Sequence, residues 1–149
     1  MNSYLLLRLA HLLFVATWFG VGLTLPGDIR RTLARGRPHV DSLPERMKRV
    51  GFISLGSGIA AIGAGLGLIF VRGGFAVVAH RIHAGLALGL VLLGVGVAGF
   101  LTRQKIAKVI LDGGDLAAAT SLAKRNSMFN GIEQTLWLAI LALMVLPLF

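Results

Sequence analysis

This sequence contains no cysteine, and charged residues make up only 14% of it. Soluble domains average roughly 25% charged residues. The lack of cysteine excludes disulfide bonds and thiolate metal sites. Also missing are a catalytic triad, a nucleotide-binding loop and a pair of carboxylates spaced for acid–base chemistry. Any catalysis would therefore depend on a bound cofactor.

Apolar residues are abundant instead, at 56% of the 149 residues, and there are twenty glycines. A helix needs about 20 mostly apolar residues to cross the hydrocarbon core of a bilayer. Four stretches satisfy this requirement. We therefore expect an all-α fold, an integral membrane antiparallel four-helix transmembrane bundle that forms a single domain over residues 1–149. The predicted spans are about 4–25, 50–71, 75–101 and 128–149, the third beginning near Phe75 or Ile82.

The basic residues predict the orientation. Twelve of the fifteen lie in two polar segments, about 26–49 and 102–127, and only Arg8, Arg72 and Arg81 lie on the opposite side. Cytoplasmic loops carry such an excess of lysine and arginine. We expect both segments to be cytoplasmic and both termini extracytoplasmic, in the inner membrane of a bacterium. The net charge of +9 is then a topology signal with contacts to anionic lipid, and no nucleic-acid partner is expected.

The polar segments have helix signals of their own. Residues 28–37 are expected to form a short basic helix on the membrane surface, and residues 42–45 look like the start of the second long helix. Asp115 is placed to cap a connecting helix over 116–125. Short cytoplasmic connecting helices are therefore part of the expected fold.

Two glycine pairs, Gly63 with Gly67 and Gly85 with Gly89, have the GxxxG spacing that lets helices approach closely. One interpretation is tight helix packing alone. The other is a flat cofactor lying against backbone where side chains are missing.

Ionisable groups within a membrane are rare, so each is a candidate for function. His11 lies roughly 10 Å along the first helix, at 1.5 Å per residue. Trp18 follows at i+7 on the same face, and Arg8 lies one turn nearer the surface. Trp18 is too deep for an interfacial belt, so we expect it to line the interior.

His80 and His83 are expected near the start of the third helix, with His83 at almost the depth of His11. Two neutral imidazoles at one depth can ligate haem iron axially. Arg8 and Arg81 are placed to pair with the haem propionates. We therefore predict haem b, with His11 and His83 as ligands and His80 as the alternative to His83.

Simpler roles remain open for the same residues. A histidine near the interface often hydrogen-bonds to a backbone carbonyl, water or a lipid headgroup. A zinc or copper site would need a third ligand. His39 is expected to be solvated. Glu133 is expected to pair with Arg125 or Lys124, or else to relay protons.

The stretch from His11 to Gly20, HLLFVATWFG, resembles the first helix of HemJ-type protoporphyrinogen oxidases, as do Leu25-Pro26, Arg81-Ile82-His83 and Arg125-Asn126. The chain also resembles CopD-like copper-resistance proteins. The family arginine after Leu-Pro would fall at Gly27, and the family lysine after the helix-3 histidine at Ala84, so both charges are absent. The resemblance implies haem binding, while these two departures weaken the case for porphyrinogen oxidation.

The sequence thus predicts a b-type haem protein that exchanges electrons with a quinone, a porphyrin or another partner, or a divergent porphyrinogen oxidase. Two alternatives stay open. One is a non-enzymatic membrane subunit, as a homo-oligomer or within a larger complex. The other is a CopD-like copper or solute permease.

Overall fold

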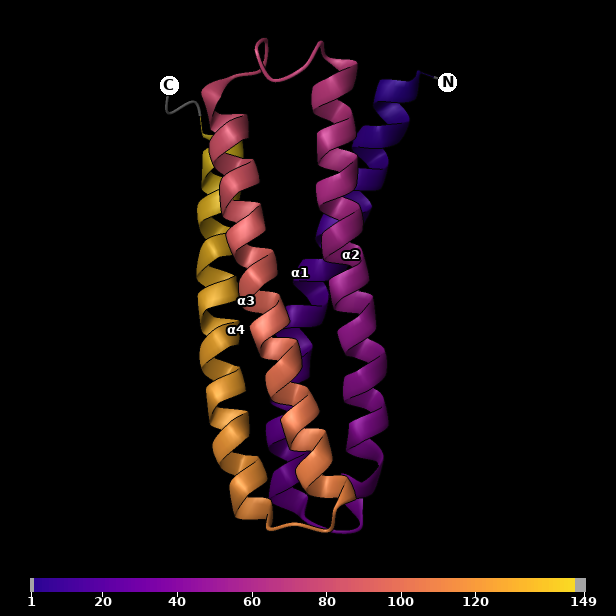
Figure 1. Cartoon of the computed structure of the whole chain (residues 1–149), viewed down its shortest axis with the longest axis vertical. Coiled ribbons are helices and arrows are strands. Elements are labelled where there is room, and N and C mark those ends of the chain that lie inside the picture. Colours follow the sequence, from indigo (N-terminus) through magenta and orange to yellow (C-terminus); the bar gives the residue numbers. More distant parts are fainter. Residues whose placement is uncertain (1, 147–149) are drawn as a thin grey trace.

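The computed structural model describes residues 2–146, which form four long antiparallel helices (Figure 1). The helices are α1 (Ser3–Arg35), α2 (Leu43–Val71), α3 (His80–Leu111) and α4 (Leu116–Val145), and a short 3-10 helix, η1 (His39–Ser42), joins α1 to α2. Each helix packs on the next and α4 returns to α1, whereas no Cα atom of α1 lies within 8 Å of one in α3. This ring confirms the predicted all-α four-helix bundle.

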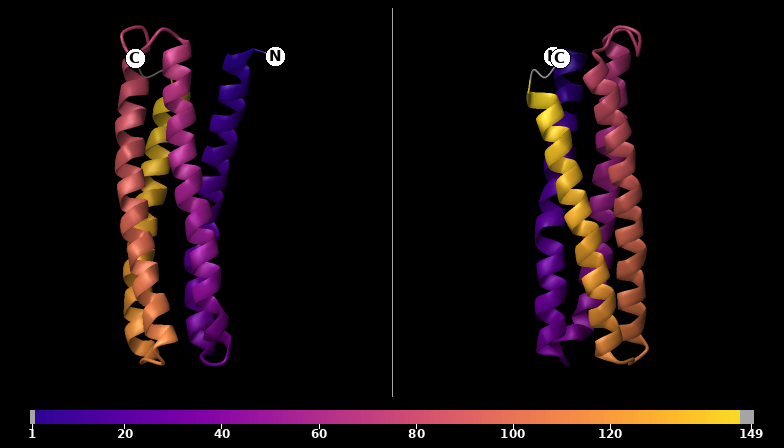
Figure 2. Two further views of the ribbon diagram at one scale, coloured as in Figure 1. Left: turned by 45° about the vertical axis from the view of Figure 1, so that its right-hand side comes forward. Right: turned by 90° about the vertical axis from the view of Figure 1, so that its left-hand side faces the viewer.

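All four helices are long and apolar enough to cross a membrane, which indicates a multi-pass membrane protein. They have 29 to 33 residues each. At 1.5 Å per residue they are roughly 45–50 Å long, against about 30 Å for the hydrocarbon core. The start of α1 and the end of α4 lie at one end of the bundle, and the α1–α2 and α3–α4 connections lie together at the other (Figure 2). We call this second end, residues 25–50 and 102–127, the basic end.

The first helix does not end at Pro26-Gly27, where its apolar stretch ends, but continues to Arg35. Proline removes one backbone donor from a helix. Ile29 and Leu33 beyond it nevertheless continue the buried face of Leu25, and their burial favours continuing the helix. Gly36 then ends α1 with a φ of 67°, a left-handed conformation that suits glycine.

The connecting helices at the basic end are extensions of the long helices and not separate elements. Residues 28–35 belong to α1 and not to a surface helix. Residues 116–125 form the first turns of α4, and the Asp115 side chain accepts a hydrogen bond from the Ala117 N–H at 2.9 Å, which confirms the predicted cap. The second helix begins at Leu43 as predicted, and the third begins at His80.

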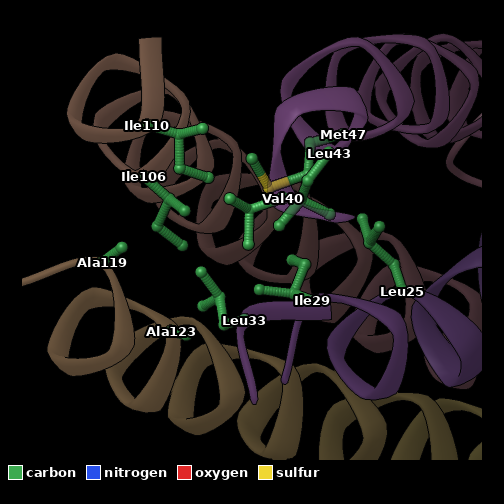
Figure 3. Packing of buried hydrophobic residues seen from close by; sticks show 10 residues of the cluster. All are labelled: Leu25, Ile29, Leu33, Val40, Leu43, Met47, Ile106, Ile110, Ala119 and Ala123. Carbon is green, nitrogen blue, oxygen red and sulfur yellow. The ribbon is translucent and has the colours of Figure 1, made fainter. Parts of the chain in front are cut away.

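The largest buried cluster lies at the basic end (Figure 3). Side chains from α1, η1, α2, α3 and α4 meet there. Its members are Leu25, Ile29, Leu33, Val40, Leu43, Met47, Ile106, Ile110, Ala119 and Ala123. A core of this kind forms when apolar side chains are removed from water.

Candidate functional site

His11 is half-buried on α1 and directs its ring at α2. Its Nδ1 atom is 2.8 Å from the carbonyl oxygen of Ala61. A carbonyl oxygen only accepts hydrogen bonds, so Nδ1 carries the proton and donates. In the neutral ring Nε2 is then unprotonated, and no residue in the described range hydrogen-bonds to it. Histidines that bind metals are usually oriented by such a bond from the other ring nitrogen.

Small residues on α2 make room for the rings of α1. A methyl group at Gly65 would lie 3.2 Å from Cε1 of His11, and one at Gly58 would lie 3.0 Å from the Trp18 ring. Gly58, Ala61 and Gly65 are spaced three and four residues apart, so they share one face of α2. This face is the seam between α1 and α2.

The GxxxG pairs do not form such seams. Gly67 packs against Leu7, but a methyl group at Gly63 would meet nothing within 4 Å. Gly85 likewise packs against α4 while Gly89 faces open space. One glycine of each pair therefore serves helix packing, and Gly58 and Gly65 pack at positions that the GxxxG spacing did not identify.

Trp18 is 4% exposed, in agreement with its predicted interior position. Its ring meets that of Trp137 on α4 edge to face, with centroids 5.1 Å apart. Ala61 and Leu92 complete a small buried cluster with the two tryptophans. The centre of the bundle at this depth is thus filled by aromatic packing.

His83 lies on the opposite side of α3 from the bundle interior. The inward face of α3 is marked by the buried residues Gly85, Leu92 and Gly96. His83 precedes Gly85 by two residues, or about 200° around a helix of 3.6 residues per turn. Its ring lies against His80, at 6.2 Å between centroids, and Phe75, at 5.8 Å. The structure therefore brings His83 and His80 together and does not bring His83 to His11.

The arginines predicted to pair with propionates, Arg8 on α1 and Arg81 on α3, are both exposed. At the same end of the bundle, Arg72 makes side-chain contacts with Tyr4. It donates to the Tyr4 hydroxyl and lies over the Tyr4 ring, 5.0 Å from its centroid. This contact ties the first turn of α1 to the end of α2.

A buried polar layer lies between the two apolar clusters, and of its five residues the sequence pointed to Glu133 alone. It consists of Arg103 on α3 and of Asn126, Asn130, Glu133 and Gln134 on α4. Arg103 is 9% exposed and Asn126 only 1%. The Arg103 Nη1 donates to Asn126 Oδ1 at 3.3 Å.

Glycines of α3 and α1 make space for this layer. A methyl group at Gly96 would lie 3.1 Å from Glu133 Oε1, and one at Gly99 would lie 3.3 Å from Arg103 Nη1. On α1, a methyl group at Gly22 would lie 2.9 Å from Gln134 Nε2. Three helices therefore enclose these polar groups.

The layer has hydrogen-bonding capacity that its own residues do not use. Three buried atoms of the layer have no hydrogen-bond partner among the described residues, Arg103 Nε, Asn126 Nδ2 and Gln134 Nε2, and neither has Oγ of the neighbouring Ser127. All four can donate a hydrogen bond. Because buried donors are nearly always paired, the layer is suited to bind an acceptor group.

Glu133 does not pair with Lys124 or Arg125, contrary to the simpler expectation. Those two side chains are exposed, and Arg125 lies over the Phe129 ring. Glu133 is seven residues after Asn126 and shares its inward face, where the nearby charge is that of Arg103. A signal was present, since 126, 130, 133 and 137 have helical spacing. Arg103 lies in α3, whereas the sequence predicted a loop from residue 102 onward, so helical spacing did not identify it.

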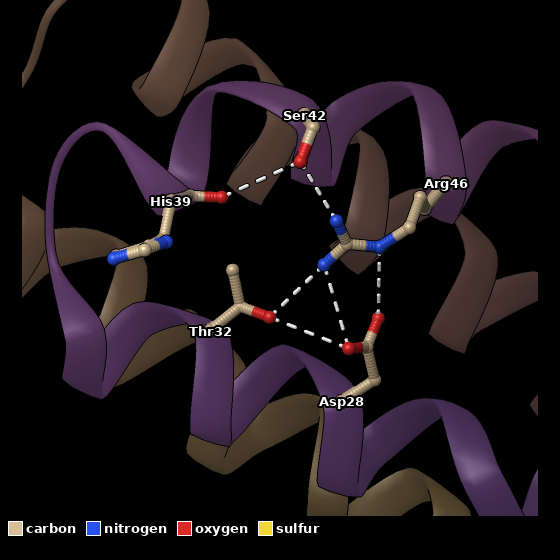
Figure 4. Close-up of polar contacts among 5 residues, drawn as sticks. All are labelled: Asp28, Thr32, His39, Ser42 and Arg46. Carbon is tan, nitrogen blue, oxygen red and sulfur yellow. Dashed lines mark hydrogen bonds and ion pairs between the residues drawn. The ribbon is translucent and has the colours of Figure 1, made fainter.

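At the basic end, four side chains join α1 to the start of α2 (Figure 4). Arg46 donates from Nε to Asp28 Oδ2 at 3.2 Å and from Nη2 to Thr32 Oγ1 at 3.0 Å. Its Nη1 donates to Ser42 Oγ at 2.7 Å. These residues, with Arg35, Pro38 and His39, line a pocket of about 440 Å³.

No protein-family model, curated protein or solved structure matches this chain in comparisons with each. Function is therefore argued from the residues. Within residues 2–146, no three His, Asp or Glu side chains gather as a metal site would require. Haem binding needs fewer protein ligands than such a metal site does. His11 is suited to it, because its ring is held in place and its Nε2 atom is free. His83 would fit only if α3 turned about its axis.

Proposed function

We propose that this multi-pass membrane protein binds a b-type haem through His11 and takes part in electron transfer. It lies in a bacterial inner membrane, with the basic end in the cytoplasm. The supporting observation is the hydrogen bond from His11 Nδ1 to the Ala61 carbonyl, which leaves Nε2 as a free ligand atom. Haem would supply one-electron chemistry in this position.

The residues around His11 have defined roles in this proposal. Gly65 and Ala61 of α2 position the ring. Arg8, one turn nearer the helix end and exposed, supplies a positive charge for a propionate. His83 is the second ligand if α3 can turn, and His80 is its neighbour. A quinone or a porphyrin is the expected redox partner, on the basis of the resemblance.

The test is an absorption spectrum of the purified protein after haem is supplied. We expect a Soret band from the unaltered protein, its loss in His11→Ala, and its retention in His39→Ala, which removes an exposed histidine at the other end of the bundle. His83→Ala and His80→Ala show whether either ring is a sixth ligand, because losing one would convert low-spin iron to high-spin. A protein that gives no Soret band under any of these conditions does not bind haem.

A second candidate is a non-enzymatic membrane subunit, because two outward glycines on α2 suit helix docking. Gly56 and Gly63 are exposed, one heptad apart, and a methyl group at either would meet nothing within 4 Å. Exposed small residues allow a second transmembrane helix to approach closely. Stoichiometric co-purification of another membrane protein, lost in Gly63→Leu and without any absorbing cofactor, would favour this function over haem binding.

A further inference from the structure

The pocket at the basic end lies where the apolar part of α1 gives way to charge. A second pocket of about 190 Å³ lies next to it, since both pockets are lined by Asp28, Thr32 and Arg35. The second pocket begins at Thr24, within one turn of the last apolar residues of the first span. From Thr24 to Arg35 the helix rises about 16 Å. The two pockets thus extend along α1 from the end of its apolar stretch into its charged part.

The only carboxylate that lines these pockets is already neutralised. Asp28 accepts hydrogen bonds from Arg46 Nε at 3.2 Å, from Arg46 Nη2 at 3.4 Å and from the Thr32 hydroxyl at 3.3 Å. Arg46 in turn uses its third nitrogen on Ser42. This network makes a fixed wall between α1 and α2 and leaves Asp28 little capacity to repel an anion.

Two further arginines on the same wall have no counter-charge. Arg31 and Arg35 are exposed and form no ion pair with any residue in the described range 2–146. They are four residues apart on one face of α1, so their like charges repel, and the Arg31 guanidinium lies back toward Gly27, where a methyl group would be 3.3 Å from its Nη2. An anion between them would relieve that repulsion.

We propose that these pockets bind an anionic phosphate group between Arg31 and Arg35. Guanidinium groups match phosphate oxygens with paired hydrogen bonds, and they do so better than lysine. The shared chemistry fits either a phospholipid headgroup at the membrane surface or a free phosphate from the water. Arg46 and Asp28 position the wall and do not bind the phosphate.

The experiment uses the whole protein in detergent supplemented with phosphatidylcholine. Phosphatidylglycerol is titrated in, and the lipid retained by the protein is counted by native mass spectrometry. In a parallel arm, inorganic phosphate is titrated and its ³¹P line width is followed. Arg31→Gln and Arg35→Gln are compared with Arg30→Gln, which removes an equal charge from an exposed neighbour that lines neither pocket.

We expect Arg31→Gln and Arg35→Gln each to weaken phosphatidylglycerol binding about tenfold, the effect of losing one hydrogen bond to a charged group, and Arg30→Gln to change it much less. The same pattern with inorganic phosphate and none with lipid would support the site and identify free phosphate as its ligand. Equal losses in all three variants would mean diffuse electrostatic attraction and overturn the proposal. So would the failure of both probes to bind the unaltered protein.

Discussion

The basic end and the apolar part of the bundle pack by different means. At the basic end, ten apolar side chains form one buried cluster, to which every helix contributes. In the apolar part, which we define as residues 3–24, 51–100 and 128–146, the corresponding cluster has only Trp18, Ala61, Leu92 and Trp137. Elsewhere in that part, contacts depend on rings and side chains that fit against glycine.

The difference follows from the solvent around each region. Apolar burial drives helices together in water, whereas lipid tails are as apolar as leucine and provide no such drive. A bundle in lipid therefore relies on close approach at small residues and on polar contacts. Such a contrast is expected if the basic end lies outside the hydrocarbon core and the apolar part within it. The polar layer of Arg103 and α4 lies at the transition between them.

The largest expected effect comes from opening the core of the basic end. Ile29 is 1% exposed, so Ile29→Ala should lower the free energy of unfolding by about 2–4 kcal/mol through lost burial and the cavity that remains. Denaturant unfolding in detergent, followed by circular dichroism, measures the loss.

Its control is Leu138→Ala in the apolar part, where the side chain is 63% exposed to lipid or detergent. Little change in stability is expected there. Similar losses at both positions would show that another surface covers Leu138 and would remove the contrast between the two regions.

The polar layer should give the next largest effect. Asn126→Ala deprives the buried Arg103 of its hydrogen-bond acceptor, and we expect a loss of about 1–3 kcal/mol in unfolding free energy. Asn126→Asp should lose less, since a carboxylate still accepts from the guanidinium. If Asn126→Ala and Asn126→Asp lower the free energy of unfolding equally, the hydrogen bond to Arg103 does not stabilise the part of the bundle where the two regions meet.

A smaller effect is expected at the seam between α1 and α2. Alanine in place of an exposed helical glycine gains up to about 1 kcal/mol from helix propensity. Gly63→Ala, with open space around it, should show this gain, whereas Gly65→Ala should show less because its methyl group crowds His11 at 3.2 Å. Parallel thermal unfolding of the two variants measures the difference. A larger gain in stability for Gly65→Ala than for Gly63→Ala would contradict the close contact between Gly65 and His11.

The smallest effect is expected for ion pairs at the basic end. The pair between Asp28 and Arg46 is a little over two-fifths exposed, so Asp28→Asn should lower stability by less than about 1 kcal/mol, and by still less in high salt. The pair between Glu45 and Arg49 is 79% and 74% exposed, and Glu45→Gln should have no measurable effect. A greater loss at Glu45 than at Asp28 would reverse the expected order.

Much of the fold could be predicted from the sequence, because a long run of apolar residues indicates a helix that can cross a membrane. That indication does not depend on which other helices lie beside it. The shared face of His11 and Trp18 was predictable for a similar reason, since spacing along one helix fixes it. The continuation of α1 past Pro26 was not predictable, because it depends on the partners that bury Ile29 and Leu33. The contact between Arg103 and Asn126 was not predictable either, because it depends on how α3 and α4 are rotated against each other.

By itself, the sequence determined four helices long and apolar enough to cross a membrane, an end rich in arginine and lysine, and the residues in which function can reside. Only the tertiary structure decided that His11 bonds to Ala61, that His83 faces away from it, and that Arg103 lies buried beside Asn126. The physical reason is that hydropathy and spacing are properties of single helices. The partner of a side chain depends also on how each helix is rotated about its axis and set beside the next.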